Sequence, residues 1–273
     1  MVNFPDSLDT LSNPNADTLL DAAGLEHDVQ HANLNDIVEA LEAKLGISLS
    51  TDVNSVDYLL KLLGQAITPA DAFDDEFRGG SLDEKWAWTN QSTASSLLGK
   101  SHLALTFPAS TTDQCRQLIQ AISGSTWRIE ACCSLLWNYN EANAATSYLY
   151  GGLCAREAAS GKIVTFGLNW RAGTFYVYGH KWTNDTTISA ALFTAVAIPN
   201  NQYYLSLERT ATSLVGQISL DGDIWQTVFT ETLVASLGFT AGPDYAGFWG
   251  TAFKSGTATT PVTAIFDYLR KVA

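Results

Sequence analysis

Beyond residue 73 the chain is dominated by short segments in which apolar and polar residues alternate. In Arg128–Tyr139 the apolar residues occupy every second position, and Lys162–Trp170 has the same period. Because successive side chains of a β-strand point to opposite faces, this period indicates strands that bury one face. Further strands are predicted at Thr174–Tyr178, Tyr203–Arg209, Ser213–Leu220, Ile224–Phe229 and Thr263–Arg270, with a tight hairpin at Asp221-Gly222. Such a series predicts a mainly β, antiparallel two-sheet jelly roll.

An earlier segment, Gln30–Gly46, has the period of an α-helix instead. Asn33 is suited to cap the start of this helix, and Gly46 is suited to end it. Its apolar residues are spaced four, three and four apart and so form one narrow stripe: Leu34, Val38, Leu41 and Leu45.

A second amphipathic helix is predicted at Ser48–Gln65. Two short helices bury little apolar surface within one chain, so they need cover from elsewhere. We therefore expect the chain to form a homo-oligomer through this two-helix stalk, with a trimer as the expected form.

Residues 1–29 show neither the strand period nor the helix period. Phe4, Leu8 and Leu11 are isolated apolar anchors in a polar segment that cannot bury a core of its own. We expect an extended arm that lies on a partner protein, with disorder as the alternative. The predicted organisation is an attachment arm at 1–29, a helical oligomerisation segment at 30–66, a linker at 67–73 and a jelly-roll domain at 74–273.

Acidic charge is concentrated in the first quarter of the chain. Of 28 acidic residues, 15 lie in 1–76 against only Lys44 and Lys61, whereas the remaining acids and bases balance, and all eight Trp lie beyond residue 76. This contrast indicates two structural units. An acidic chain without a basic cluster argues against nucleic acid or an anionic membrane as a partner. The polar start Met1–Thr10 does not fit a signal peptide, and no apolar run is long enough to span a membrane.

Metal-binding patterns are incomplete. The four cysteines, Cys115, Cys132, Cys133 and Cys154, include no C-x-x-C pair, so we expect buried, reduced thiols. His27 and His31 have the spacing of a zinc-hydrolase motif, but an Asp replaces its Glu and no third ligand is evident. Calcium at Asp221 and Asp223 would have two of the six to eight oxygens that it prefers. We therefore predict no cofactor.

The sequence also does not supply the residues of a glycosidase in a recognisable pattern. A retaining glycosidase needs two carboxylates about 5–5.5 Å apart. The candidate acids are Glu130 and Glu208, each alone in its strand, and the group Asp71, Asp74, Asp75 and Glu76 near the linker. On this basis we predict that the chain is not an enzyme.

One group of side chains favours sugar binding. Tyr176, Tyr178, His180 and Trp182 share one parity, so they would line one sheet face if the strand continues that far. Flat aromatic faces with a few polar groups are suited to sugar rings. The alternative is that these rings pack the sandwich or an oligomer interface. A second aromatic row is predicted from Trp137, Tyr139, Tyr148 and Tyr150, with polar contacts from Arg171, Asn169 and Asn138.

The N-terminal segments resemble a module of tailed-bacteriophage virion proteins such as fibre, neck, baseplate and head-appendage subunits. The resemblance rests on FPDSLDTLSNP at Phe4–Pro14, HANLNDIVEALEAKLGI at His31–Ile47 and SVDYLLK at Ser55–Lys61. It implies incorporation into a virion assembled in the host cytoplasm, through contacts of residues 1–66 with other virion proteins.

The remainder resembles concanavalin A-like lectin and glucanase jelly rolls. The similar segments are the opening strand FDDEFRGGSLDEKWAWTN at Phe73–Asn90, the strands and turn of Tyr203–Val228, and the closing strand FDYLRKV at Phe266–Val272. We expect Phe266, Tyr268, Trp225 and Trp86, which lie in these motifs, to pack the fold.

Together these features predict a virion fibre or receptor-binding subunit whose jelly roll binds a host-surface glycan. The first alternative is a purely structural virion component, in the head, neck or baseplate, without a sugar ligand. The second is a glycan depolymerase, which the missing acid pair disfavours.

Overall fold

The computed structural model describes residues 27–46, 55–59, 71–137, 147–254 and 261–272. The chain divides into two compact units, 1–68 and 69–273, and each is treated by itself. Of the predicted arm, residues 1–26 with Phe4, Leu8 and Leu11 lie outside the described residues. Most of the predicted second helix also lies outside them, although residues 56–59 are helical.

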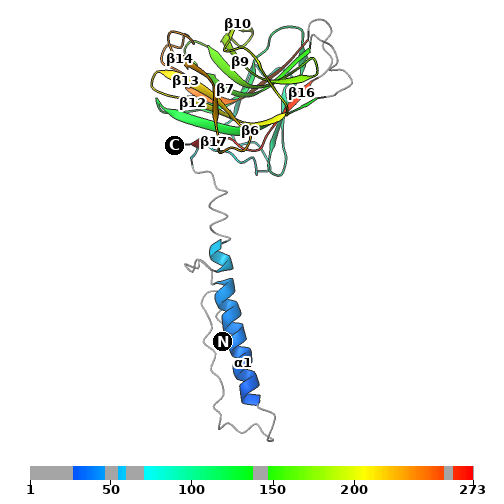
Figure 1. The fold of residues 1–273 in the computed structure, drawn as a ribbon, viewed down its shortest axis with the longest axis vertical. Coiled ribbons are helices and arrows are strands. Elements are labelled where there is room, and N and C mark those ends of the chain that lie inside the picture. Colours follow the sequence, from blue (N-terminus) through cyan, green and yellow to red (C-terminus); the bar gives the residue numbers. More distant parts are fainter. Residues whose placement is uncertain (1–26, 47–54, 60–70, 138–146, 255–260, 273) are drawn as a thin grey trace. The chain divides into compact units, whose positions relative to one another are not determined.

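Helix α1 runs from His27 to Leu45 and is the long element of the first unit (Figure 1). It starts earlier than expected, so Asn33 lies inside the helix and is not its N-cap. The extra residues include neither Gly nor Pro, which would have ended the helix. At the other end Gly46 adopts φ 82° and donates its N–H to the Glu42 carbonyl at 2.8 Å, which confirms the predicted terminal glycine. No described helix is both long and apolar enough to cross a membrane.

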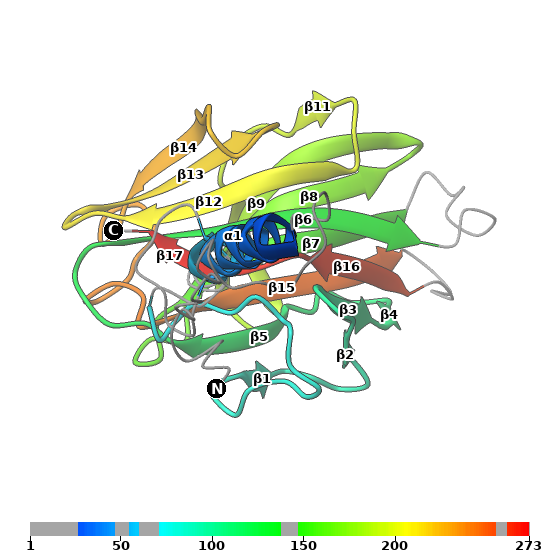
Figure 2. The ribbon, with the colours of Figure 1, turned by 90° about the horizontal axis from the view of Figure 1, so that it is seen from below.

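The second unit is a sandwich of two sheets whose strands pair antiparallel, except that β4 pairs parallel to β15 (Figures 1 and 2). The nine-stranded sheet has, in spatial order, β1 (Ala87–Thr89), β5 (Arg116–Ala121), β15 (Tyr245–Lys254), β7 (Ser147–Arg156), β8 (Ile163–Arg171), β9 (Thr174–Asn184) and β10 (Thr187–Ala191). Two short strands join its path: β11 (Val196–Ile198) beside β9 and β4 (Ala109–Ser110) beside β15.

The eight-stranded sheet has, in spatial order, β14 (Gln226–Thr232), β13 (Ser213–Ser219), β12 (Gln202–Arg209), β6 (Trp127–Trp137), β16 (Val262–Phe266), β3 (Leu103–Phe107) and β2 (Ser95–Leu98). Strand β17 (Arg270–Val272) pairs with β6. The mainly β architecture predicted from the alternating pattern is therefore confirmed.

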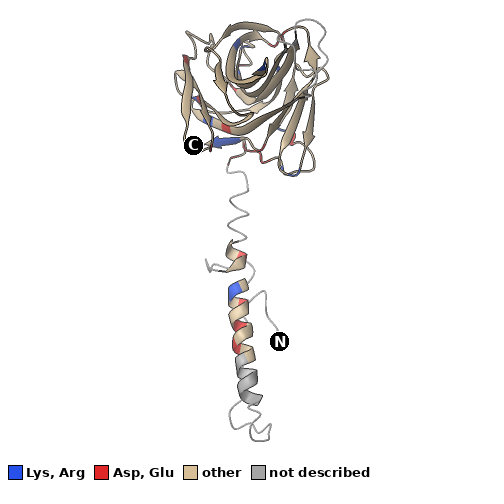
Figure 3. Ribbon diagram, turned by 45° about the vertical axis from the view of Figure 1, so that its right-hand side comes forward, with Lys and Arg blue, Asp and Glu red and all other residues tan. Residues whose placement is uncertain are grey.

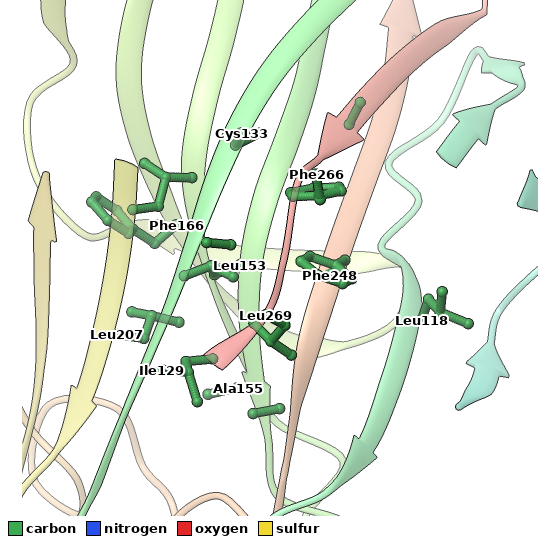
Figure 4. Packing of buried hydrophobic residues seen from close by; sticks show 14 of the residues in the cluster. Leu118, Ile129, Cys133, Leu153, Ala155, Phe166, Leu207, Phe248, Phe266 and Leu269 are labelled. Atoms are coloured by element: carbon green, nitrogen blue, oxygen red, sulfur yellow. The ribbon is translucent and has the colours of Figure 1, made fainter. Parts of the chain in front are cut away.

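The core lies between the two sheets, where alternate side chains of each strand meet (Figure 4). Ile129 and Cys133 of β6 face Leu153 of β7 and Phe166 of β8 across this layer, and all four are buried. The parities predicted for β6 and β8 are confirmed. The four cysteines are free and buried, as predicted, and the adjacent Cys132 and Cys133 contact different partners, Gln202 and the Gly151 carbonyl.

The two ends of the second unit are fastened to each other. Asp75 forms a β-bridge with Leu269, Asp74 accepts the backbone N–H of Lys271 at 2.6 Å, and Glu76 pairs with Arg270 at 2.6 Å. The closing segment Phe266–Val272 therefore contacts the N-terminal edge of the unit. The acidic residues near the predicted linker thus help to hold the two ends of the unit together. Phe73, at the end of that linker, is already buried in the core.

The turns differ in part from the sequence prediction. The hairpin expected at Asp221-Gly222 is a longer connection, because Ile218 pairs with Gln226 and the carboxylate of Asp221 accepts the N–H groups of Asp223 and Ile224, each at 2.9 Å. Oxygen Oδ1 of Asp221 is therefore already hydrogen-bonded to the backbone of its own turn. The described residues contain no group of three or more potential metal ligands.

A buried carboxylate joins two connections of the second unit. Glu157 follows β7, and its oxygens accept backbone N–H groups of three consecutive residues, 240–242, at 2.6–2.9 Å, as well as the Ser160 hydroxyl. Burial raises the pKa of Glu157, but the hydrogen bonds from Ser160 and the backbone outweigh it and lower the pKa to about 2. The ionised carboxylate therefore stabilises the folded domain.

We expect Glu157→Gln to lower the free energy of unfolding at pH 7 by about 1–3 kcal/mol, because an amide leaves some of these donors unpaired. The folded pKa lies below the ordinary value of 4.5, so the contribution is present above that pH and is lost as the pH falls towards 2. Urea denaturation at pH 7 and pH 3 measures both effects. Glu84→Gln, an exposed carboxyl, is the control. Equal stability of the two variants at pH 7 would contradict the prediction.

Candidate functional site

The outer face of the nine-stranded sheet is unusual because its centre is also buried. Eight of the nine residues of β8 are buried, so side chains of both parities are covered. The register aligns Trp249, Gly152, Gly167 and Tyr178 in one row across β15, β7, β8 and β9. The two middle positions of this row have no side chain.

These two glycines are required by the backbone. A Cβ on Gly167 would lie 2.3 Å from the carbonyl oxygen of Gly151, and a Cβ on Gly152 would lie 2.3 Å from that of Phe166. Such distances are not tolerated, so β7 and β8 approach each other only because both positions are Gly. The row from Trp249 to Tyr178 therefore has no side chain at its two middle positions.

The ring of Tyr150 lies between Trp249 and two side chains of β9. Its centroid is 5.8 Å from Trp249 on one side, and 5.9 and 5.3 Å from Tyr178 and His180 on the other. Tyr148 stacks on it at 6.2 Å with nearly parallel planes. Tyr150 is therefore the centre of the aromatic cluster, and the predicted residues Tyr178 and His180 meet it from β9. Strand β9 does extend through Trp182, as the shared parity required.

Polar atoms without partners surround the Tyr150 ring. Nδ1 of His180, Nε1 of Trp249 and Oγ1 of Thr251 are buried and have no hydrogen-bond partner among the described residues. Thr251 is the register partner of Tyr150. Burial lowers the pKa of His180 to about 4, so its ring is neutral at pH 7. A buried polar atom normally finds a partner, and three of the nine such atoms without one among the described residues lie around this ring.

One end of the face is closed by the turn between β9 and β10. Asp185 in this turn pairs with Arg156, accepts a hydrogen bond from Gln117 at 2.7 Å, and accepts the N–H of Cys115 on its carbonyl at 2.7 Å. Beneath it lies a small apolar cluster that includes Trp182 and Trp249. Trp182 is buried and donates to Oγ1 of Thr165 at 2.9 Å, so this predicted ligand contact packs the fold.

The other end of the face carries partly exposed aromatic side chains. Tyr148, Tyr150, Tyr176 and Tyr178 are half-buried there, and the Arg171 guanidinium lies 4.8 Å from the Tyr148 ring. Asp113, in the connection from β4 to β5, is half-buried, and burial raises its pKa.

Asp113 also acts on the aromatic cluster. Burial and the neighbouring tyrosines raise the pKa of Tyr150, and the charge of Asp113 adds to that effect. Its carboxyl has no ion pair or hydrogen bond among the described residues, and sequence analysis did not single it out. No pattern marks it, because it lies in a connection and reaches the face only through the fold.

Other predicted contacts need correction. Trp137 ends β6 in the eight-stranded sheet, so it does not share a sheet with Tyr148 and Tyr150, and Tyr139 and Asn138 lie outside the described residues. Asn169 is buried and donates to the carbonyls of Leu149 and Trp170. The predicted second row thus came from two different sheets, because alternation gives the face of a strand but not its sheet.

Carboxylates are scarce on this side of the domain. None of the nine strands of this sheet contains Asp or Glu. Glu130 lies on β6 in the other sheet, where its carboxylate pairs with Arg128 at 2.6 Å. Two clefts of the domain lie away from this face. One of about 360 Å³ is lined by Asp71, Lys85 and Lys271, and one of about 480 Å³ is lined by β11 and the connection after β13.

No protein-family model matches the sequence, and no curated protein matches it. Several solved structures share the fold. A GH43 protein, BlXynB, from Bacillus licheniformis is 12% identical with a TM-score of 0.54, and the match covers 74% of this chain and 39% of that one. The xyloglucan PUL GH43B of Bacteroides ovatus is 14% identical with a TM-score of 0.52, covering 76% and 39%. A bifunctional GH43-CE protein of Bacteroides eggerthii is 17% identical at 0.50, covering 73% and 25%.

These matches correct two predictions. The chain was expected to be a virion adhesin or purely structural virion component, and not an enzyme, whereas the three similar structures are described as glycoside hydrolase family proteins and none as a virion protein. At 12–17% identity the likeness shows the fold alone, and the chain spans about two fifths or less of those proteins. The predicted fold, an antiparallel jelly roll of the concanavalin A-like kind, is confirmed.

We expect Gly167→Ala to lower the free energy of unfolding by about 1–3 kcal/mol, because its Cβ would push β8 away from β7. Gly80→Ala is the matched control, since a Cβ there meets nothing within 4 Å and should leave stability unchanged or slightly higher. Urea unfolding followed by Trp fluorescence compares them. If both variants were as stable as the parent, the close approach of the strands would not depend on glycine.

Proposed function

We propose that the jelly-roll domain hydrolyses glycosidic bonds in a neutral glycan that binds across the Tyr148–Tyr150–Tyr178 face, with Asp113 as the proton donor. The observation that carries the proposal is the half-buried carboxyl of Asp113, which has no ion pair or hydrogen bond among the described residues. It lies in the connection between β4 and β5, which both pair with β15, the strand beside Tyr148 and Tyr150 of β7. It replaces the adhesin without enzymatic activity that the sequence suggested.

The chemistry of the face suits a sugar ring. The C–H faces of a pyranose pack on tyrosine and tryptophan rings, while its hydroxyls need donors and acceptors close by. The half-buried Tyr148, Tyr150 and Tyr178 offer hydroxyls that can donate or accept, whereas Trp249 and Thr251 are buried beneath them. His180 is neutral, so the centre of the face carries no fixed charge that would select an ionic sugar.

Asp113 suits the role of a general acid. Such a group must hold a proton near the working pH and must be free to give it away. Burial holds the pKa of Asp113 above its ordinary value, and no cation among the described residues pairs with it. By contrast, the carboxylate of Asp185 forms an ion pair with Arg156 and accepts a hydrogen bond from Gln117.

In the proposed reaction Asp113 gives its proton to the glycosidic oxygen as the bond from that oxygen to the anomeric carbon breaks. Water supplies the new hydroxyl at the anomeric carbon, and its released proton restores the carboxylic acid of Asp113 or goes to solvent. We assign the activation of that water to none of the described residues.

The similar structures support the class of reaction, since they are described as glycoside hydrolase proteins that share this sandwich. Because the matches cover only part of each of those chains, this support concerns carbohydrate as substrate class and not a particular linkage.

We expect Asp113→Asn to reduce hydrolysis about 10²–10⁴-fold, the usual contribution of a general acid, while glycan binding is retained. The assay measures new reducing ends from soluble neutral polysaccharides that include xyloglucan, and affinity electrophoresis measures binding. The parent activity should fall as the pH rises above the raised pKa of Asp113, since the acid must be protonated. That fall should vanish in the variant.

The matched control is Asp223→Asn, which neutralises an exposed carboxyl in the connection between β13 and β14. It should keep full activity. Hydrolysis by Asp113→Asn at the parent rate would contradict the role of Asp113. A folded parent protein that cleaves none of the polysaccharides would contradict the proposed reaction itself.

A further inference from the structure

Helix α1 exposes the apolar stripe that amphipathic helices bury. Leu34 and Leu41 are each 57% exposed and Ile37 is 64% exposed, and Val38 and Leu45 are exposed as well. We call these five residues the α1 stripe. An isolated helix that leaves such a stripe in water is poorly stabilised, because most helix stability in proteins comes from packing that face.

The polar side of the same helix is the covered one. Glu42 is only 7% exposed, and Asn35 and Glu39 are half-buried and also have interaction partners. Along α1, therefore, the apolar side chains are exposed and the polar side chains are the more buried ones. Covering a carboxylate while exposing five large apolar side chains is unfavourable in water. The described residues leave the stripe exposed, so a further surface is needed to cover it.

The spacing of the stripe is suited to packing against another helix. Leu34, Val38, Leu41 and Leu45 follow each other at four, three and four residues, which are the d, a, d and a positions of a heptad repeat. This period is the one at which helices of the same sequence interdigitate side chains along a common seam. An unrelated flat surface would not require it.

Charge placement agrees with packing between identical helices. Asp36 and Glu39 fall at the f and b positions, which point away from the seam, and Ile37 and Lys44 flank it at g positions. Glu42 also flanks the seam, at an e position. Figure 3 shows Asp and Glu of the described helix in red and Lys in blue. Copies can therefore meet along the stripe with one carboxylate of each chain at its edge, and the acidic chain as a whole repels itself at low salt.

We propose that the α1 stripe is a self-association surface that joins two or three copies of this chain through their α1 helices. Val at an a position with Leu at d positions favours two strands, whereas Ile37 widens the apolar face towards three. This inference is independent of the proposed hydrolysis, because none of its residues belongs to the jelly-roll domain.

The test uses the full chain in sedimentation equilibrium from about 1 to 100 μM. The parent should show a mass of two or three chains, and added salt should strengthen association because the acidic helices repel each other less. Leu41→Asp should weaken association about 100-fold or more, since every copy would place a charge in the seam. Ala43→Asp adds the same charge at an exposed position off the stripe and should associate like the parent.

All eight Trp lie beyond residue 76, so their fluorescence reports the folding of the jelly roll separately from α1. We expect an unchanged spectrum in both variants. A monomeric parent at 100 μM would overturn the inference, as would association of Leu41→Asp equal to that of the parent. Equal dissociation of both Asp variants would overturn the assignment to the stripe. None of these results bears on the hydrolysis assay, which fails or succeeds through Asp113.

Discussion

The close approach of β7 and β8 at Gly152 and Gly167 is the constraint on which the domain depends. It allows the central strands to be buried on both faces: the inner face joins the core, and the outer face accepts Tyr150 and Trp249. The floor of the candidate site is thereby part of the most tightly packed region of the domain. Rigid strands, and not loops, hold the aromatic cluster, which is the arrangement that keeps binding groups in fixed positions.

That rigidity makes the unpaired polar atoms informative. Each buried atom without a hydrogen bond costs about 1–3 kcal/mol, and His180, Trp249 and Thr251 place three of them around one ring. Six further buried side-chain atoms of the described residues also lack a partner, on Arg116, Gln117, Trp127, Arg209 and Gln217, so it is the grouping of three around one ring that distinguishes this place. Glu157 shows the opposite arrangement, because its carboxylate accepts three backbone N–H groups.

Much of the fold could be predicted from the sequence, because alternation reports directly which face of a strand is buried. It identified the inward residues of β6 and β8 and the shared face of Tyr178 and His180. It could not say which sheet a strand joins, so Trp137 was grouped with tyrosines of the other sheet. Asp113 and Asp185 were missed for a related reason: they lie in connections, and only the pairing of distant strands brings them to the face.

The proposed roles of the two units, binding of a glycan and association of chains, complement each other. A face that holds one sugar ring through aromatic contacts and a few hydrogen bonds offers limited affinity, because ordering the ligand and its side chains consumes much of the gain. Joining two or three chains through α1 would convert later contacts with a repeating glycan into intramolecular events, which raises the apparent affinity without any new contact. The first unit has 11 acidic residues against Lys44 and Lys61, and the jelly roll has 17 acidic residues against 13 basic ones. Both units are thus acidic, and this charge would keep the proposed assembly soluble while the uncharged centre of the aromatic face would meet a neutral sugar.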